Sequence, residues 1–187
     1  MDVLGILGSP RRDGNTSLLL DKVLDGMRVG GADVEKLVLS DYSISPCQEC
    51  NGCADTGNCV MDDDMQMMYP KLLNADWVIL ASPIFFYGVT AQTKTLIDRC
   101  QALWSRKYLL QKTSRPNRCG MFISVGATKG AKLFDGAMLT VKYFFDAIDV
   151  KYCENLFFKE IDKKGDIKNH PTAFQEAWEI GKRLAES

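Results

Sequence analysis

The sequence predicts a doubly wound α/β sandwich, in which a five-stranded parallel sheet carries helices on both faces. Three observations lead to this prediction. Short strand-like runs alternate along the chain with longer segments whose apolar residues recur at helical spacing. Five such strands are interleaved with helices, which means a parallel sheet that is covered on both sides. The length of 187 residues is that of one domain, so we expect residues 1–187 to form a single domain.

The elements are expected in the following order. Asp2–Leu7 is the first strand, and the helix after it repeats apolar residues from Leu18 to Met27 and closes at Gly30–Gly31. The other strands are expected at 34–39, 77–81, 121–125 and 150–157, and the other helices at 65–73, 92–104, 133–148 and 172–185. A long polar loop with four cysteines, at about 45–61, follows the second strand. Parallel sheets bind ligands at the carboxyl ends of their strands, so the loops after the strands are the expected place for a site.

Composition and charge exclude several classes of protein. Apolar residues make up 46% and charged residues 25%, as in a folded globular protein rather than a disordered one. Lys and Arg total 23 against 24 Asp and Glu, which gives no reason to expect a nucleic-acid or membrane partner. The apolar runs 77–81 and 83–87 are much shorter than the ~20 residues of a membrane helix. The chain start lacks the basic region of a secretory signal. We therefore expect a cytoplasmic protein, whose seven cysteines are ligands, reactive thiols or core residues rather than a disulfide framework.

The loop after the first strand, Gly8–Ser17, has the features of a phosphate site. It leads directly into a helix, whose first turn offers free N–H groups and a positive dipole end. Ser9, Asn15, Thr16 and Ser17 add polar groups, and Arg11 adds charge. The glycine spacing of a dinucleotide fingerprint and the lysine of a Walker A loop are both absent. The alternative is an ordinary helix start with Asn15 as its cap.

At this point the chain resembles the flavodoxin-like FMN reductase superfamily. The resemblance rests on Gly-Ser-Pro-Arg with Gly-Asn-Thr after the first strand, and on Ser-Pro-Ile-Phe-Phe-Tyr-Gly-Val at 82–89 followed by Thr-Lys-Thr-Leu-Ile-Asp-Arg at 93–99. It implies a single flavodoxin-like FMN-binding domain. By position, the FMN phosphate would be held by Ser9, Arg11, Asn15, Thr16 and Ser17. The ribityl chain and the ring edge would be wrapped by Pro83, Ile84, Phe85, Phe86, Tyr87 and Gly88, and the polar end of the ring would be covered by Gly126, Ala127 and Thr128. The alternative for the three aromatic residues is core packing.

Four cysteines, Cys47, Cys50, Cys53 and Cys59, are crowded into the loop after the second strand. Their C-x2-C-x2-C-x5-C spacing lets the thiolates surround one centre, with Gly52 and Gly57 allowing tight turns. The motif resembles that of the iron-sulfur flavoproteins, which implies a [4Fe-4S] cluster. It differs from the bacterial ferredoxin run, whose last spacer is shorter and whose last cysteine is followed by proline, because Val60 follows Cys59 here. A structural zinc and metal-free thiols remain alternatives. Cys100, Cys119 and Cys153 are interpreted as small buried apolar residues.

Three further features have ordinary structural interpretations. The acids at 62–64 immediately precede a helix, where carboxylates cap free N–H groups. His170 is the only histidine, which argues against a hydrolase triad, and electron transfer through a flavin needs no catalytic side chain. The segment 99–134 contains basic residues and no acid. It is either solvated surface or a docking face, with Arg106, Lys107, Lys112 and Arg115, for an acidic donor or a nucleotide phosphate.

Together these features predict an FMN-binding oxidoreductase, an iron-sulfur flavoprotein that relays electrons from a reduced donor to a small acceptor. A ferredoxin-like protein or NAD(P)H would be the donor, and the resemblance implies a homodimer or tetramer. One alternative is an NAD(P)H-dependent FMN or quinone reductase without a cluster. The other is a flavodoxin-like electron carrier without turnover of its own; carriers of that kind are usually strongly acidic, whereas this chain has a net charge of -1.

Overall fold

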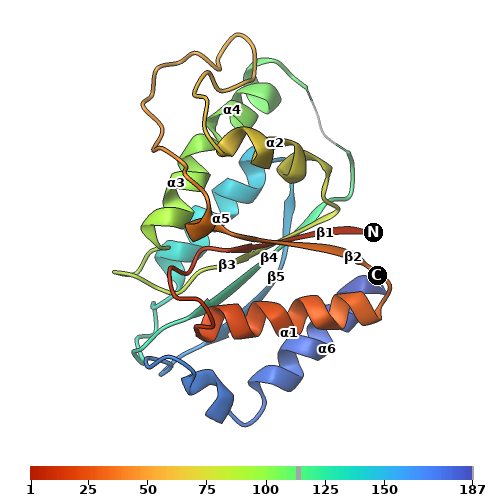
Figure 1. The fold of residues 1–187 in the computed structure, drawn as a ribbon, viewed down its shortest axis with the longest axis vertical. Helices are drawn as coiled ribbons and strands as arrows, with labels where there is room; N and C mark the ends of the chain where they lie inside the picture. Colours follow the sequence, from red (N-terminus) through yellow and green to blue (C-terminus); the bar gives the residue numbers. More distant parts are fainter. Residues whose placement is uncertain (113–114, 187) are drawn as a thin grey trace.

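A central sheet of five parallel strands organises the chain in the computed structural model, which describes residues 1–112 and 115–186 (Figure 1). The strands are β1 (Asp2–Leu7), β2 (Asp33–Val38), β3 (Trp77–Ala81), β4 (Cys119–Val125) and β5 (Lys151–Phe158), in the spatial order β2-β1-β3-β4-β5. This is the flavodoxin-like order, so the predicted fold class is confirmed. From β1, the next strand is added on one side of the sheet and all later strands are added on the other side. The position between β1 and β3 is therefore the switch point, where such folds bind ligands.

Helices cover both faces of the sheet and form one layer on each face (Figure 1). One face carries α1 (Asn15–Val29) and α6 (Ala173–Ala185), which pack on the apolar side chains of β1, β3 and β4. The other carries α2 (Met65–Asn74), α3 (Ala91–Arg99), α4 (Gln101–Trp104) and α5 (Asp135–Ala147). Each layer has its own core, because the side chains of a strand alternate between the two faces. Within the described ranges, no helix is long and apolar enough to cross a membrane.

The expected elements are present, with differences at their ends. The bounds predicted for β1 and β3 are those observed, whereas β2 begins and ends one residue earlier than expected. The single helix expected at 92–104 is broken at Cys100, whose N–H bonds to the carbonyls of both Leu96 and Ile97. The chain then continues through α4 into a π-helical turn, Ser105–Leu109. Short 3₁₀ turns at Leu39–Asp41 and Asp166–Asn169 were not predicted.

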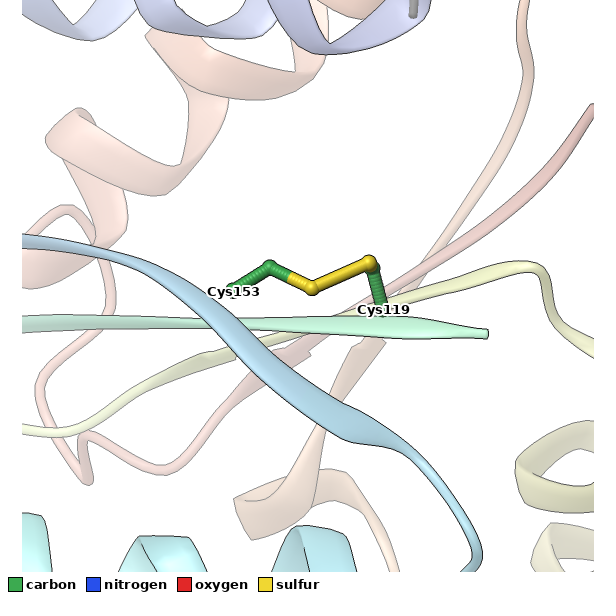
Figure 2. Close-up of a disulfide and its surroundings, with 2 residues drawn as sticks. All are labelled: Cys119 and Cys153. Atoms are coloured by element: carbon green, nitrogen blue, oxygen red, sulfur yellow. A yellow bond between two sulfur atoms is a disulfide. The ribbon is translucent and has the colours of Figure 1, made fainter. Parts of the chain in front are cut away.

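The interpretation of Cys119 and Cys153 as buried apolar residues was wrong, because they form a disulfide (Figure 2). Cys119 is half-buried at the start of β4, and Cys153 is exposed on the neighbouring β5. The pairing of the two strands passes from Gly120–Tyr152 to Met121–Glu154, so Cys153 is an extra residue in a bulge. This brings the two Cα atoms to 5.7 Å, a separation that suits a disulfide. Cys100 is buried, as expected.

Candidate functional site

Loops that follow β1, β3 and β4 meet in one pocket at the carboxyl end of the sheet. The pocket has a volume of about 110 Å³. Of the residues predicted to hold FMN, it is lined by Ser9, Arg11, Asn15, Thr16, Pro83, Ile84, Phe85, Gly126 and Ala127. Ser17, Phe86, Tyr87, Gly88 and Thr128 do not line it. The structure thus brings three separate predicted segments together, and their role in binding FMN stays a prediction.

A fourth loop, which the sequence analysis did not include, completes the pocket. Ile161, Asp162 and Lys164 follow β5 and line its wall. Asn15 connects this loop to the start of α1, because its Nδ2 donates to the Lys163 carbonyl at 2.9 Å and its Oδ1 accepts from Gly165 N at 2.9 Å. Asn15 therefore braces the pocket wall. The signal for this loop was its position after the fifth strand, at the same edge of the sheet.

The start of α1 keeps the open N–H groups that a phosphate needs. Its N-cap residue is Gly14, which has no side chain to cap the first turn, so the alternative interpretation of Asn15 as the cap is wrong. Thr16 is buried beside these groups, and the Ser9 hydroxyl accepts a bond from Arg11 N at 3.2 Å. The Ser17 hydroxyl accepts from Lys36 at 3.3 Å and so has a partner within the chain. An uncapped helix start with a buried hydroxyl fits a phosphate group.

The loop after β3 displays aromatic side chains in a strained turn. Phe85 and Gly88 exchange backbone hydrogen bonds of 2.9 Å in each direction. The two residues between them, Phe86 and Tyr87, have positive φ angles of 49° and 61°. Such a turn favours Asn and Gly, and bulky residues there carry a strain of about 1–3 kcal/mol each. Phe86 is nevertheless fully exposed, at 104% of its reference area. Core packing is therefore wrong as an interpretation of this run, because these rings face outward.

The size of the pocket indicates how a flavin mononucleotide would fit. Pockets for whole ligands of that size span about 300–1,000 Å³, so 110 Å³ encloses only one end of the molecule. The polar lining of Ser9, Arg11 and Thr16 matches a phosphate end. The ring would lie outside the enclosed part, beside the exposed aromatic turn. The Tyr87 and Thr128 hydroxyls both lie close to Gly130. The residues present fit FMN.

The four cysteines border a second cavity, of about 350 Å³, above α3 and α4. Its wall includes Cys47, Cys50, Cys53 and Cys59, together with Asp98, Arg99, Gln101 and Ala102 from the end of α3 and the start of α4. Within residues 1–112 and 115–186, no three His, Cys, Asp or Glu side chains are placed closely enough to hold a single metal ion. Four thiols around one cavity are still the donor set that an iron-sulfur cluster uses. The donor chemistry fits such a cluster, whereas the sulfur positions are not those of a closed metal site.

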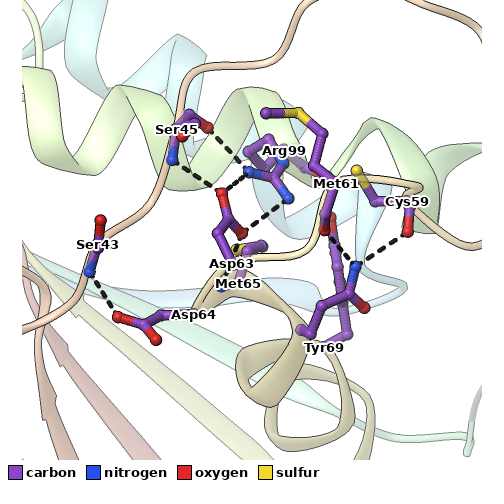
Figure 3. A network of polar contacts seen from close by, with 10 residues as sticks. Ser43, Ser45, Cys59, Met61, Asp63, Asp64, Met65, Tyr69 and Arg99 are labelled. Carbon is purple, nitrogen blue, oxygen red and sulfur yellow. Dashed lines mark hydrogen bonds and ion pairs between the residues drawn. The ribbon is translucent and has the colours of Figure 1, made fainter.

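The acids before α2 hold the cysteine loop in place (Figure 3). Asp64 accepts from Ser43 N at 2.6 Å, and Asp63 accepts from Ser45 N at 2.9 Å. Asp63 also accepts from Met65 N at 3.1 Å, so helix capping is only part of its role. Its main partner is the buried Arg99, whose Nη1 lies 2.5 Å from Asp63 Oδ2. No local sequence pattern indicates this ion pair, because it joins residues far apart in the chain.

The environment of Cys59 favours its thiolate. Burial by itself would raise the pKa of Cys59, but a hydrogen bond from the Met61 backbone, the nearby Tyr69 hydroxyl and the Arg99 charge outweigh burial and lower it. Desolvation by itself would raise the pKa of Asp63, but hydrogen bonds donated by Arg99, Ser45 N and Met65 N outweigh it and lower the pKa. Burial raises the pKa of Cys100, which lies outside the loop. The pKa shifts of Cys59 and the core cysteine Cys100 thus have opposite directions.

Helix α3 connects the two cavities. At its start, the Thr90 hydroxyl caps Thr93 N and donates to the Gly8 carbonyl at 2.5 Å, beside the pocket at the carboxyl edge. At its end, Arg99 borders the cysteine cavity. Nine residues of helix span about 13 Å. The two cavities are therefore at the two ends of one short helix.

The basic segment divides into buried and surface residues. Arg99 and Arg118 are buried, and Arg118 donates to the backbone carbonyls of Leu72, Ala75 and Ile148, so neither can belong to a docking face. The four residues predicted to form a docking face, Arg106, Lys107, Lys112 and Arg115, line one cavity of about 440 Å³. Lys107 pairs with Asp146 at 3.0 Å, and Arg115 pairs with Asp76 at 3.1 Å. Arg106 contacts the cysteine loop, because a Cβ added to Gly57 would lie 2.3 Å from Arg106 Cγ.

Comparison with known proteins places these features in context. A family model described as NADPH-dependent FMN reductase matches residues 1–162. An iron-sulfur flavoprotein of Methanocaldococcus jannaschii is 39% identical over 129 residues, which are 69% of this chain and 64% of that protein. An iron-sulfur flavoprotein of Archaeoglobus fulgidus is 46% identical over 99 residues, which are 53% of this chain and 45% of that protein. The chain thus spans less than two thirds of the length of these two relatives.

The fold also matches solved structures at low sequence identity. A NAD(P)H:quinone oxidoreductase from Methanothermobacter marburgensis superimposes with a TM-score of 0.75 and 15% identity, over 98% of this chain and 96% of that one. A flavone reductase superimposes with a TM-score of 0.70 and 21% identity, over 100% of this chain and 62% of that one. At these identities the likeness concerns the fold.

Proposed function

The chain belongs to the NADPH-dependent FMN reductase family, and from this premise we propose that it is an FMN-binding oxidoreductase that works as an iron-sulfur flavoprotein. It would relay electrons from a reduced donor to a small acceptor through FMN and a [4Fe-4S] cluster. The observation that carries the proposal is the cavity bordered by Cys47, Cys50, Cys53 and Cys59, at the end of the helix that starts beside the flavin pocket. The curated relatives named iron-sulfur flavoprotein support it.

The chain's own groups have distinct tasks in this proposal. The open N–H groups at the start of α1, with Thr16 and Arg11, bind the FMN phosphate. Asn15 holds the loop after β5 against that end of the pocket. The Phe85–Gly88 turn offers exposed rings on which the flavin edge packs. When bound, FMN supplies one- or two-electron chemistry and the cluster one-electron chemistry.

The electron donor would approach the cysteine loop from its basic side. Arg106 lies against Gly57 of that loop, and its Nη1 is 3.4 Å from the Asn58 side-chain oxygen. Lys107, Lys112 and Arg115 line the same neighbouring cavity. An acidic ferredoxin-like protein that bound this face would be brought next to the cysteines by complementary charge. With NAD(P)H as donor, the open side of the flavin pocket beside Tyr87 is the place of contact.

A second copy of the chain would cover the exposed apolar residues near the flavin pocket. Leu139 and Tyr143 are exposed one turn apart on α5. Gly136 lies one helical turn before Leu139. It approaches the loop that contains Phe86 and Tyr87 so closely that an added Cβ would be 2.7 Å from the Tyr87 carbonyl oxygen. Phe86 and Tyr87 are exposed in that turn. We propose a homodimer, or a tetramer built from it, with this surface in the interface. Light scattering of the wild type and of Leu139→Glu tests it, and a wild-type monomer would refute it.

A reductase without a cluster is the second candidate, and one observation favours it. The four cysteine sulfurs do not converge into a closed metal site within the part of the chain that the structure describes. In that case, NAD(P)H would reduce FMN directly and the flavin would pass electrons to a free flavin or a quinone. The thiols would then be free or would form labile disulfides.

The experiment that separates the two is spectroscopy of the anaerobically purified protein, with flavin, iron and sulfide assayed on the same sample. We expect flavin together with iron and sulfide, and a broad absorbance beneath the flavin bands. Cys50→Ala should lose iron and sulfide and keep flavin, because Cys50 borders the cysteine cavity and not the flavin pocket. Cys100→Ala is the matched control, since this buried cysteine lies outside the loop. Flavin without iron or sulfide after reconstitution would favour the clusterless reductase.

A further inference from the structure

Arg99, the last residue of α3, carries a fully buried guanidinium group. Its side chain is 0% exposed. Nη1 and Nη2 donate to the two oxygens of Asp63 at 2.5 and 3.0 Å, and Nη1 also donates to the Ser45 carbonyl at 2.9 Å (Figure 3). Removing a charge from water is costly unless a partner of opposite charge compensates it. The ion pair with Asp63 provides that compensation and anchors Arg99 to both ends of the cysteine loop.

One N–H donor of the Arg99 guanidinium group has no hydrogen-bond partner among the described residues. Arg99 Nε is buried, and among the described residues no acceptor bonds to it. Buried polar groups in native proteins are almost always hydrogen-bonded, so an unpartnered N–H on a paired guanidinium group indicates that it serves a further acceptor. Arg99 borders the cavity of the four cysteines, and Cys59 lies beside it (Figure 3). A thiolate sulfur is an acceptor of suitable charge at that place.

The backbone of Cys59 is held in place beside this group. Gln66 Nε2 donates to the carbonyls of Cys59 and Met61 at 2.9 and 2.7 Å, which fixes the backbone on both sides of Val60. Tyr69, whose hydroxyl donates to the Arg99 carbonyl at 2.9 Å, packs between the helix and the loop. Arg99 and Cys59 are thus each held by a residue at the start of α2, Arg99 by Asp63 and Cys59 by Gln66.

Resting on the proposed cluster, we propose that Arg99 is a positioning residue of the cysteine site that raises the reduction potential of the cluster. It donates from Nε to the sulfur of Cys59 and keeps a fixed positive charge, balanced by Asp63, at the edge of the cavity. Each reduction adds one negative charge to a site with thiolate ligands. A hydrogen bond to a ligand sulfur favours the more negative state, and such bonds are among the factors that set the potentials of these clusters.

The test is the midpoint potential of the cluster in the anaerobically reconstituted full chain, followed by electron paramagnetic resonance during a redox titration. Arg99→Gln with Asp63→Asn removes the pair without leaving a buried charge, so the net charge is unchanged and the donor to Cys59 is lost. We expect the reduced-to-oxidised ratio at the wild-type midpoint to fall about tenfold, a shift of about 59 mV for a one-electron couple. Arg99→Lys keeps the charge without Nε and should shift the ratio in the same direction.

Controls separate this role from a structural one. Lys94→Gln removes a half-exposed positive charge of the same helix that lines neither cavity, and it should leave the midpoint unchanged. Flavin content and unfolding midpoint show whether each variant folds. Wild-type midpoints in both the double variant and Arg99→Lys overturn the proposal. If the double variant binds no cluster, Arg99→Lys decides alone: a lowered midpoint supports the proposal, and an unchanged one overturns it.

Failure of the proposed function gives a different result. If wild type takes up flavin but neither iron nor sulfide, the iron-sulfur proposal fails first and the role of Arg99 fails with it. If wild type takes up the cluster and the variants titrate like wild type, only the inference on Arg99 is overturned.

Discussion

Gly8→Ala should uncouple two loops of the proposed flavin pocket, because Gly8 is where they are joined. Its N–H donates to the Ala81 carbonyl at 2.8 Å, and its carbonyl accepts from the Thr90 hydroxyl at 2.5 Å. These bonds tie the end of β1 to the end of β3 and to the start of α3. A Cβ at this position would lie 1.8 Å from Thr93 Oγ1, far inside van der Waals contact. The α3 start must therefore move.

The size of the effect follows from these contacts. Overpacking of a buried site costs about 1–3 kcal/mol, and loss of the hydrogen bond from Thr90 adds about 1 kcal/mol. We expect the free energy of unfolding to fall by about 2–4 kcal/mol in urea titrations followed by circular dichroism. FMN affinity, measured by flavin fluorescence, should fall as well. Gly130→Ala is the control for the free energy of unfolding, because its added Cβ would come no closer than 3.5 Å to the residues around it.

The contact with Thr93 can be tested directly. Thr93→Ala removes the Oγ1 atom that a Cβ at Gly8 would strike, so it should recover at least 1 kcal/mol in the Gly8→Ala background although it costs stability alone. Equal losses in Gly8→Ala and Gly130→Ala, or no recovery in the double variant, would refute the reasoning.

Three further changes test other parts of the structure. Thr16→Asp places a carboxylate in the phosphate end of the pocket, so the flavin absorbance per chain should fall at least tenfold, and full retention of flavin would contradict the site. Cys153→Ser opens a disulfide that spans 34 residues and should lower the free energy of unfolding by up to about 4 kcal/mol in non-reducing urea titrations, whereas under reducing conditions it should match wild type. The lowered pKa of Asp63 means that its pair with Arg99 stabilises the fold above pH ~4 and less as pH falls. The stability difference between wild type and Asp63→Asn should therefore shrink on acidification from pH 7 to pH 3, and a constant difference would be inconsistent with this pair.

Most of the fold could be predicted from local patterns in the sequence. The bounds of β1 and β3 agree with the prediction because an apolar strand is recognised from its own residues. The break at Cys100 was missed because both halves of the segment keep helical spacing. The aromatic turn at 85–88 was missed because Phe86 and Tyr87 adopt a conformation that bulky residues rarely take.

The sequence by itself determined the order of the elements, the parallel sheet and the edge at which the predicted flavin loops lie. The elements follow from the spacing at which apolar residues recur, and the edge follows from the rule that the carboxyl ends of parallel strands lie at the same edge of a sheet. Only the tertiary structure decided which side chains meet across long separations: Asp63 with Arg99, Cys119 with Cys153, and Asn15 with the loop after β5. The physical reason is that such pairs depend on strand order, register and helix placement together. No short stretch of sequence encodes them.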